Sequence, residues 1–145
     1  MAGQVARLET FQPEIVAFCC ENSGYLAAQM AIEAKLSYPQ TVTLVKLPCS
    51  GRVDALFLLK ALENGADGVM VLACQKENCK FLKGNVRAEQ RIEATRKTLQ
   101  RIGIQPERVA FCHLAANMGH KFVEEVRGLY GKLTELGPNP GKVRK

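Results

Sequence analysis

The sequence contains no tryptophan, and aromatic residues make up only 6% of its 145 residues. Proteins that bind nucleic acids commonly combine a basic surface with a recognisable motif or with aromatic side chains that stack on bases. Neither feature is present here, so we expect no nucleic-acid partner. The net charge of +6 does not change this, because Lys142, Arg144 and Lys145 contribute three of the charges in a short basic tail over residues 141–145. We expect that tail to be solvated.

The chain also lacks long apolar runs. None approaches the roughly 20 residues that a membrane-spanning helix requires, so no membrane span is expected. The first residues do not contain the apolar core of a signal peptide, which predicts a cytoplasmic protein. In that compartment, six cysteines in a chain of this size indicate metal ligands or redox thiols rather than a disulfide framework.

A dinucleotide-binding fingerprint is missing as well. No Gly-x-Gly-x-x-Gly motif follows the first apolar segment, and no phosphate-binding loop occurs elsewhere. An enzyme that uses a nicotinamide cofactor or a nucleotide is therefore disfavoured.

Short apolar segments alternate with segments of helical periodicity along the chain. The expected strands cover residues 15–19, 42–47, 68–73 and 108–112, and the expected helices cover residues 25–36, 54–62, 88–102 and 122–133. This alternation predicts an α/β fold, namely a single three-layer domain with a four-stranded parallel sheet, Rossmann-like or flavodoxin-like. The domain should occupy residues 14–140, after an N-terminal lead-in over residues 1–13.

Individual residues predict how the helices begin, end and pack. Ser23 is placed to cap the first helix. Gly65 and Gly103 fit the ends of the second and third helices. Leu26, Met30 and Ala34 share one face of the first helix, and Ala88, Ile92, Thr95, Leu99 and Ile102 form a stripe on the third.

Cysteines recur where the first three expected strands end. Cys20 closes the first strand, Cys49 lies two residues beyond the second, and Cys74 directly follows the third. Parallel strands end at one edge of a sheet, which is where open α/β folds bind their ligands. Cys79 belongs to the loop after Cys74 and can fold back to the same edge. We therefore expect Cys20, Cys49, Cys74 and Cys79 to converge there.

The cysteines allow several kinds of chemistry. Four thiolates can hold an iron–sulfur cluster or a zinc ion. Cys74 and Cys79 alone can form the redox pair of a thiol–disulfide oxidoreductase, although such enzymes typically use Cys-x-x-Cys at a helix start. Any single cysteine can also simply fill the core, because free cysteine is among the most buried residue types. Cys112, which ends the fourth strand, is interpreted as structural or peripheral.

Several segments of the sequence resemble a known family, the delta subunit of methyl-viologen-reducing hydrogenase. The segments are Cys49-Ser50-Gly51-Arg52-Val53-Asp54, Gly65-Ala66-Asp67-Gly68-Val69, the pair Cys74 and Cys79, Lys83-Gly84-Asn85, and Leu136-Gly137-Pro138-Asn139-Pro140. The resemblance covers roughly residues 14–140, and the order of the segments makes it more specific than a pair of cysteines.

The resemblance implies a small 2Fe-2S electron-transfer protein with no substrate chemistry of its own. Such a protein relays electrons between a hydrogenase, a formate dehydrogenase or a similar oxidoreductase and the flavin-containing A subunit of heterodisulfide reductase. That flavin-containing partner performs flavin-based electron bifurcation. Cys20, Cys49, Cys74 and Cys79 are then the expected ligands of the 2Fe-2S cluster.

The sequence departs from the family pattern at Ser23. The family usually carries Cys-x-x-Cys in the first loop, and here Cys20 matches the first cysteine while Ser23 stands in place of the second. Serine is a poor ligand compared with a thiolate. If the cluster needs that position, the cluster is weakened, shifted in potential or lost, and a chain that has lost it is a docking subunit. If the four cysteines suffice, the cluster is intact. We favour the intact cluster, with Cys19 as the reserve ligand if Cys20 points elsewhere.

Other polar residues near the strand ends have two interpretations each. Arg52 either offsets the negative charge of a thiolate cluster or pairs with Asp54. His113 and His120 lie close to the expected start of the last helix, where a histidine is typically a cap or a surface group.

Overall fold

The computed structural model describes residues 11–48, 53–73 and 84–140 of the chain. Strands and helices alternate along it, as the sequence predicts. They are β1 (Ile15–Cys20), α2 (Gly24–Glu33), β2 (Val42–Leu47), α3 (Ala55–Glu63), β3 (Gly68–Ala73), α4 (Gly84–Arg101), the short 3-10 helix η3 (Pro106–Arg108), β4 (Val109–His113) and α5 (Gly119–Leu136).

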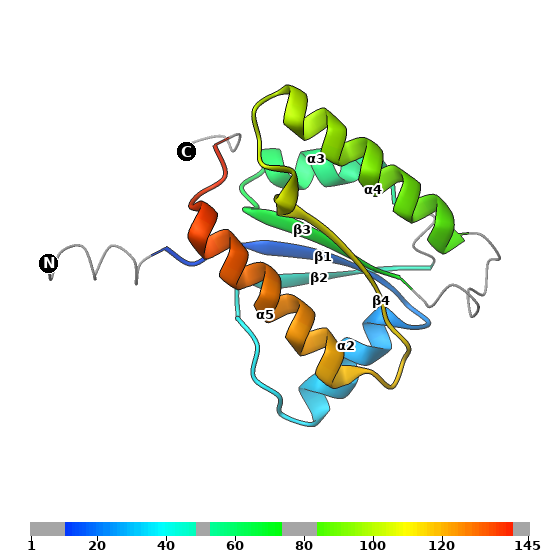
Figure 1. The fold of residues 1–145 in the computed structure, drawn as a ribbon. Coiled ribbons are helices and arrows are strands. Elements are labelled where there is room, and N and C mark those ends of the chain that lie inside the picture. Colours follow the sequence, from blue (N-terminus) through cyan, green and yellow to red (C-terminus); the bar gives the residue numbers. More distant parts are fainter. Residues whose placement is uncertain (1–10, 49–52, 74–83, 141–145) are drawn as a thin grey trace, which may run out of the picture.

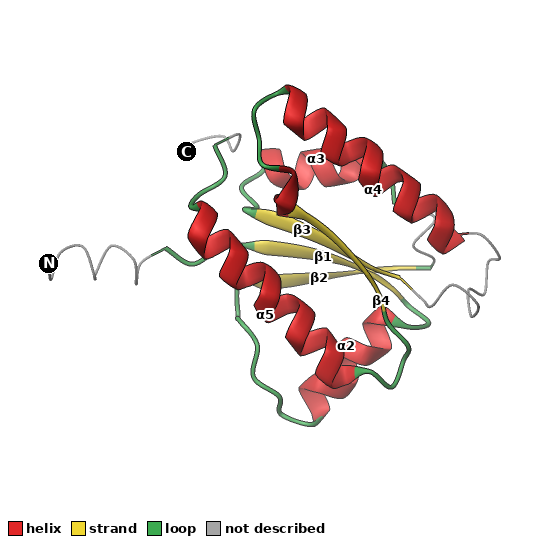
Figure 2. Ribbon diagram, viewed as in Figure 1, coloured by secondary structure: helices red, strands yellow, loops and turns green. Residues whose placement is uncertain are grey.

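The four strands form one parallel sheet in the order β2-β1-β3-β4. The α/β prediction with a four-stranded parallel sheet is therefore confirmed, and Figure 2 shows the strands fanned between two pairs of helices. The chain runs outward from β1 to β2 and then crosses back to β3 on the other side of β1. The carboxyl ends of β1 and β3 consequently form the point where the strand order reverses, which is the usual ligand position in such sheets.

Helices cover both faces of the sheet. α2 and α5 lie on one face, and α3 and α4 lie on the other (Figure 1), with a separate apolar cluster under each pair. β3 is buried along its whole length because it is central and covered on both sides. None of the described helices is both long enough and apolar enough to span a membrane.

The face that the sequence assigns to Leu26, Met30 and Ala34 is not the buried face of α2. Leu26 and Met30 are 45% and 41% exposed, and Ala34 lies in solvent just beyond the helix. The buried residues are instead the small ones, Gly24, Ala27, Ala28 and Ala31. The cause is the close approach of α5, where a Cβ added to Gly119 would lie only 3.2 Å from the backbone nitrogen of Ala31. The small residues let the two helices pack closely, and Met30, whose Cγ would lie 3.1 Å from the same Cβ, is partly exposed beside this contact.

The ends of α3 and α4 follow the prediction. Gly65 and Gly103 both have a positive φ, at 119° and 83°, which other residues rarely adopt. The buried stripe of α4 contains the predicted Ala88, Ile92, Thr95 and Leu99. Ile102 is the exception, with 61% of its surface exposed, because α4 ends at Arg101 before the stripe reaches it.

A buried carboxylate, Asp67, joins the two ends of the domain. It is 1% exposed, and it accepts hydrogen bonds from the backbone nitrogen of Glu14 at 3.0 Å and from that of Asn139 at 2.9 Å. The side-chain amide of Asn139 donates in turn to the carbonyls of Leu62 and Ala66, at 3.1 and 3.0 Å. These bonds fix the amino-terminal edge of the sheet.

The guanidinium of Arg108 completes this network and is fully buried. It donates to the carbonyls of Asp67 at 3.0 Å, Gly137 at 2.9 Å and Pro138 at 3.3 Å, and to the side chain of Gln105 at 2.8 Å. Two of the segments that resemble the hydrogenase family therefore meet here. They are held together at the end of the sheet opposite Cys20, which gives them a structural role.

Candidate functional site at the carboxyl edge of the sheet

The strand register brings the ends of the first three strands side by side. Cys20, the last residue of β1, pairs with Leu47, the last residue of β2. On the other side of β1, Cys19 pairs with Leu72, the penultimate residue of β3. The three strands thus finish within about one residue of each other, at one edge.

Three of the four predicted ligands continue from these strand ends but lie outside the described residues. Cys49 comes two residues after the end of β2, Cys74 directly follows β3, and Cys79 comes five residues later. The structure therefore places the backbone that leads to Cys49 and Cys74, and it places Cys20 itself. Convergence of the four thiols stays a prediction.

Cys20 is a buried thiol at the junction of β1 with α2. Only 3% of its surface is exposed, and its carbonyl accepts a hydrogen bond from the backbone nitrogen of Ser23 at 3.2 Å, which closes a tight turn. The turn lies between the ends of β1 and α2, at the point where the strand order reverses. Among the described residues, Cys20 is the thiol best placed for a ligand at this edge.

The neighbouring Cys19 has a different environment. It is fully buried in the apolar cluster between the sheet and the helices α2 and α5, and its Sγ donates to the carbonyl of Ala17 at 3.5 Å. Burial, followed by the nearby Cys20 thiol, raises the pKa of Cys19 to about 12. Cys19 therefore lies in the core, and its role as a reserve ligand stays a prediction.

Ser23 does not cap α2, contrary to the prediction. Its side chain makes no capping hydrogen bond, although its carbonyl accepts the backbone nitrogen of Ala27 at 2.9 Å. The side chain is 3% exposed, and its hydroxyl has no hydrogen-bond partner among the residues that the structure describes. A buried hydroxyl in that state is unusual, because buried polar groups are nearly always paired.

The start of α2 lies directly against the end of β3. A Cβ added to Gly24 would be 2.6 Å from the Cβ of Leu72 and 2.7 Å from its carbonyl oxygen, so only glycine fits. Leu72 comes two residues before Cys74. The first turn of α2, whose amides carry partial positive charge, is consequently held beside the strand end that leads to Cys74. Such an environment favours a thiolate over a thiol.

Two charged side chains flank the edge. Lys46, next to the last residue of β2, places its Nζ 5.1 Å from the centre of the Tyr25 ring in the first turn of α2. Asp54 caps α3, since its carboxylate accepts the backbone nitrogen of Leu56 at 2.9 Å. Arg52, for which pairing with Asp54 was one of two predicted roles, lies outside the described residues.

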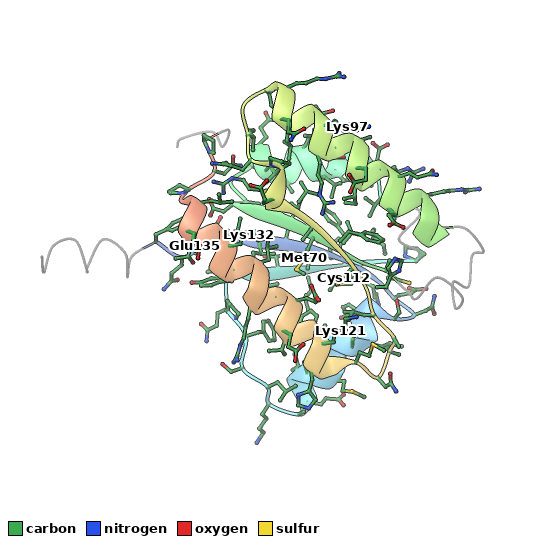
Figure 3. The ribbon with its side chains drawn as sticks, in the orientation of Figure 1. Met70, Lys97, Cys112, Lys121, Lys132 and Glu135 are labelled. Carbon is green, nitrogen blue, oxygen red and sulfur yellow. The ribbon has the colours of Figure 1, made fainter. Side chains whose placement is uncertain are left out.

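The other candidates lie at the end of β4, the outer strand of the sheet, or on the surface. Cys112 is half-buried in β4, an edge strand (Figure 3). Burial, helped by Glu125 and opposed by Lys121, raises its pKa to about 12. The ring of His113 packs edge-on against Phe111, with the ring centres 4.9 Å apart. His120 is exposed in the first turn of α5, as predicted for a surface group.

Within residues 11–48, 53–73 and 84–140, no three side chains of His, Cys, Asp or Glu gather in a way that could hold a metal ion. Of the predicted ligand set, these ranges include only Cys20. The described part of the edge nevertheless suits a thiolate-bound cluster in two respects. It offers a buried thiol in Cys20, and it offers an unpaired buried hydroxyl in Ser23 beside the positive end of a helix.

Fold and site together define a class of protein, a small parallel α/β domain whose candidate site lies where its central strands end. The particular family follows from comparison with known proteins. The family described as methyl-viologen-reducing hydrogenase, delta subunit, matches residues 15–137, and the chain belongs to this family. The resemblance seen in the sequence is thereby confirmed.

Named relatives fall into two groups. The chain is 39% identical over 132 residues to the vhu iron-sulfur subunit of the F420-non-reducing hydrogenase of Methanocaldococcus jannaschii, which covers 91% of this chain and 98% of the relative. It is 41% identical over 130 residues to the iron-sulfur subunit of the F420-non-reducing hydrogenase of Archaeoglobus profundus, and the match covers 90% of this chain and 95% of that relative. The A subunit of a CoB-CoM heterodisulfide reductase of Methanosarcina acetivorans is 32% identical over 126 residues, which is 87% of this chain but 16% of that much longer one.

Proposed function

We propose that the chain is an electron-transfer protein that holds a 2Fe-2S cluster on Cys20, Cys49, Cys74 and Cys79. It passes electrons between an oxidoreductase, such as a hydrogenase or formate dehydrogenase, and the flavin-containing A subunit of a heterodisulfide reductase-like, electron-bifurcating complex. In this proposal the protein works in the cytoplasm and carries out no substrate chemistry of its own.

The observation that carries the proposal is the register of the strand ends. β1, β2 and β3 finish side by side, with Cys20 buried at the end of the central strand. Chain segments that contain the other three predicted ligands start from the same edge. This arrangement supports a site that gathers thiols from loops far apart in the sequence, as an iron–sulfur cluster requires. The names of the hydrogenase relatives, which are iron-sulfur subunits, support the same cofactor.

The choice of partner rests on the longer relatives. In Methanosarcina acetivorans and Methanosarcina mazei, a segment similar to nearly the whole of this chain forms part of the A subunit of a heterodisulfide reductase. In those proteins the domain and the reductase are parts of one chain. Where the domain is a separate chain, the same reductase is therefore a reasonable partner for it. The hydrogenase proteins among the relatives support an oxidoreductase on the other side of the relay.

A bound 2Fe-2S cluster would accept and release one electron at a time. The described residues contribute its environment. Cys20 supplies a buried thiol, the first turn of α2 supplies partial positive charge, and Lys46 supplies a full charge near the edge. The thiol would be a ligand, and the two positive groups favour the binding of an anionic cluster.

The cofactor can be tested on protein purified without oxygen. We expect about two iron ions and about two acid-labile sulfides per chain, with a rhombic electron paramagnetic resonance signal after reduction. The Cys49→Ala variant should lose both the iron and the signal, whereas the matched Cys112→Ala variant, altered on the edge strand, should keep them. Protein that remains free of iron after reconstitution would contradict the proposal. Purified protein that contains one zinc ion per chain instead of iron would show that the site is a zinc site.

The partner needs a separate measurement. We expect Cys49→Ala to bind the flavin-containing reductase partner as the unaltered chain does but to transfer no electrons to it. If electron transfer survives in that variant, the chain is a docking protein and the electrons take another route. Reduction of insulin disulfides by the unaltered chain would instead favour a thiol–disulfide oxidoreductase that uses Cys74 and Cys79.

A further inference from the structure

Among the described residues, the hydroxyl of Ser23 is the one buried side-chain oxygen or nitrogen without a hydrogen-bond partner. The side chain is 3% exposed, so bulk water does not satisfy it. Leaving a buried donor and acceptor unpaired is unfavourable, because the group loses its hydrogen bonds to water and gains none in return. A position of this kind calls for a ligand that the described residues do not include.

The backbone around Ser23 shows why its side chain does not turn back onto α2. A serine before a helix typically accepts a hydrogen bond from the second or third helical amide. Ser23 has φ −145° and ψ −78°, outside the extended conformation of a typical cap, and its side chain makes no such bond. Its backbone is fixed from both sides, since its nitrogen donates to Cys20 and its carbonyl accepts from Ala27. The backbone of Ser23 is thus held in place, and the proton of its hydroxyl remains available.

The neighbourhood of Ser23 indicates what that proton meets. Ser23 is three residues from Cys20 and directly precedes Gly24, which packs against Leu72 at the end of β3. It therefore lies between the carboxyl ends of β1 and β3, beside the chain segment that leads to Cys74. Thiolate and sulfide sulfurs accept hydrogen bonds and carry negative charge, so they suit a hydroxyl donor at the start of a helix.

Resting on the function proposed above, we infer that Ser23 donates a hydrogen bond to a sulfur of the cluster and is not itself a ligand. Its role is to raise the reduction potential. Reduction adds one negative charge to the cluster, and a hydroxyl dipole directed at a sulfur stabilises the reduced form more than the oxidised form. Ser23 is in this sense a positioning and tuning residue for electron transfer.

The test is a redox titration of the complete, cluster-loaded chain, followed by electron paramagnetic resonance. We expect Ser23→Ala to keep its iron, its sulfide and its rhombic signal. At a fixed ambient potential its ratio of reduced to oxidised cluster should fall about tenfold, which corresponds to about 59 mV for a one-electron couple. Ser37→Ala, an exposed serine in the loop after α2, is the matched control and should titrate like the unaltered chain.

A second measurement compares the protons around the reduced cluster. In reduced, unaltered protein, electron–nuclear double resonance should detect a strongly coupled proton that disappears in deuterated water. In Ser23→Ala this particular coupling should be absent, while couplings from backbone amides remain. This comparison separates a direct hydrogen bond from an indirect effect on packing.

Several outcomes would overturn the inference. A Ser23→Ala variant with a full cluster and an unchanged potential shows that the hydroxyl does not contact a sulfur. A folded Ser23→Ala variant that loses its iron, together with a Ser23→Cys variant that retains it, assigns Ser23 as a ligand instead. If the unaltered chain binds no cluster, the proposed function fails together with this inference. If the unaltered chain binds a cluster but one of the Ser23 results above is obtained, only the inference fails.

Discussion

Replacing Arg108 by methionine should destabilise the protein strongly. The guanidinium is fully buried and donates to three backbone carbonyls and to Gln105. Methionine keeps much of the volume but leaves those acceptors unpaired and removes the charge beside the buried Asp67 carboxylate. Breaking one side of a buried charged network costs about 3–5 kcal/mol. Domains of this size typically have about 5–15 kcal/mol of stability, so the loss is a large fraction of the total.

The assay is urea denaturation followed by far-ultraviolet circular dichroism, on cluster-free chains at neutral pH. The free energy of unfolding of Arg108→Met should be lower than that of the unaltered chain by about 4 kcal/mol. Arg101→Met, which alters an exposed arginine at the end of α4, is the matched control and should change it by about 0.5 kcal/mol or less. A loss below about 1 kcal/mol in Arg108→Met would refute the view that this network holds the amino-terminal edge together.

Two further predictions concern α5 and β4. Gly131→Ala should raise the free energy of unfolding by about 0.5–1 kcal/mol, because this exposed helical glycine has open space for a Cβ. Gly119→Ala, at the crowded contact with α2, should lower it, and the reverse order of the two melting temperatures would contradict the packing described here. The pKa of Cys112 is raised from 9.0 to about 12, so its thiol ionises in the unfolded chain first, and stability is lost as the pH rises from about 9 towards 12. Urea titrations at several pH values across that range measure how steeply the free energy of unfolding falls with pH. The fall should be shallower in Cys112→Ala than in the unaltered chain, by at most about 1.4 kcal/mol per pH unit. Equal falls in the two proteins would count against a buried, protonated thiol at Cys112.

The strands were predictable because each is a short apolar run between turn residues. β3 illustrates this best, since all six of its residues are buried and none is polar. Right-handed crossovers between the strands also follow from general rules, whereas the order β2-β1-β3-β4 was not predicted. With parallel strands, the edge at which Cys20 lies could be predicted from the sequence alone.

The orientation of α2 was not predictable from hydrophobicity. A stripe of large apolar residues ordinarily marks the buried face, but here Leu26 and Met30 are exposed and alanines are buried. The reason is a property of another helix, because Gly119 lets α5 approach the backbone of α2 closely. This contact joins segments that are about 90 residues apart in the sequence, so the hydrophobic pattern of α2 alone does not predict it.

Buried polar groups were missed for a related reason. Arginine is almost never fully buried unless it is paired, so the sequence around Arg108 indicates a surface position. Its partners are carbonyls contributed by Asp67, Gly137 and Pro138, which become neighbours only in the folded chain. Ser23 shows the same limit, because a serine before a helix predicts a cap and only the three-dimensional structure reveals that the cap is not made.

The shared carboxylate of Asp67 has a consequence for how this domain can be built into larger proteins. One of its oxygens holds Glu14 and the other holds Asn139, so the points where the chain enters and leaves the domain are separated by little more than a single side chain. A host protein could accommodate the domain as an insertion without being pulled apart, and a circularly permuted version would need only a short joining peptide. Since this junction lies at the amino-terminal end of the sheet, the covalent attachment would point away from the strand ends and leave them free to face another protein.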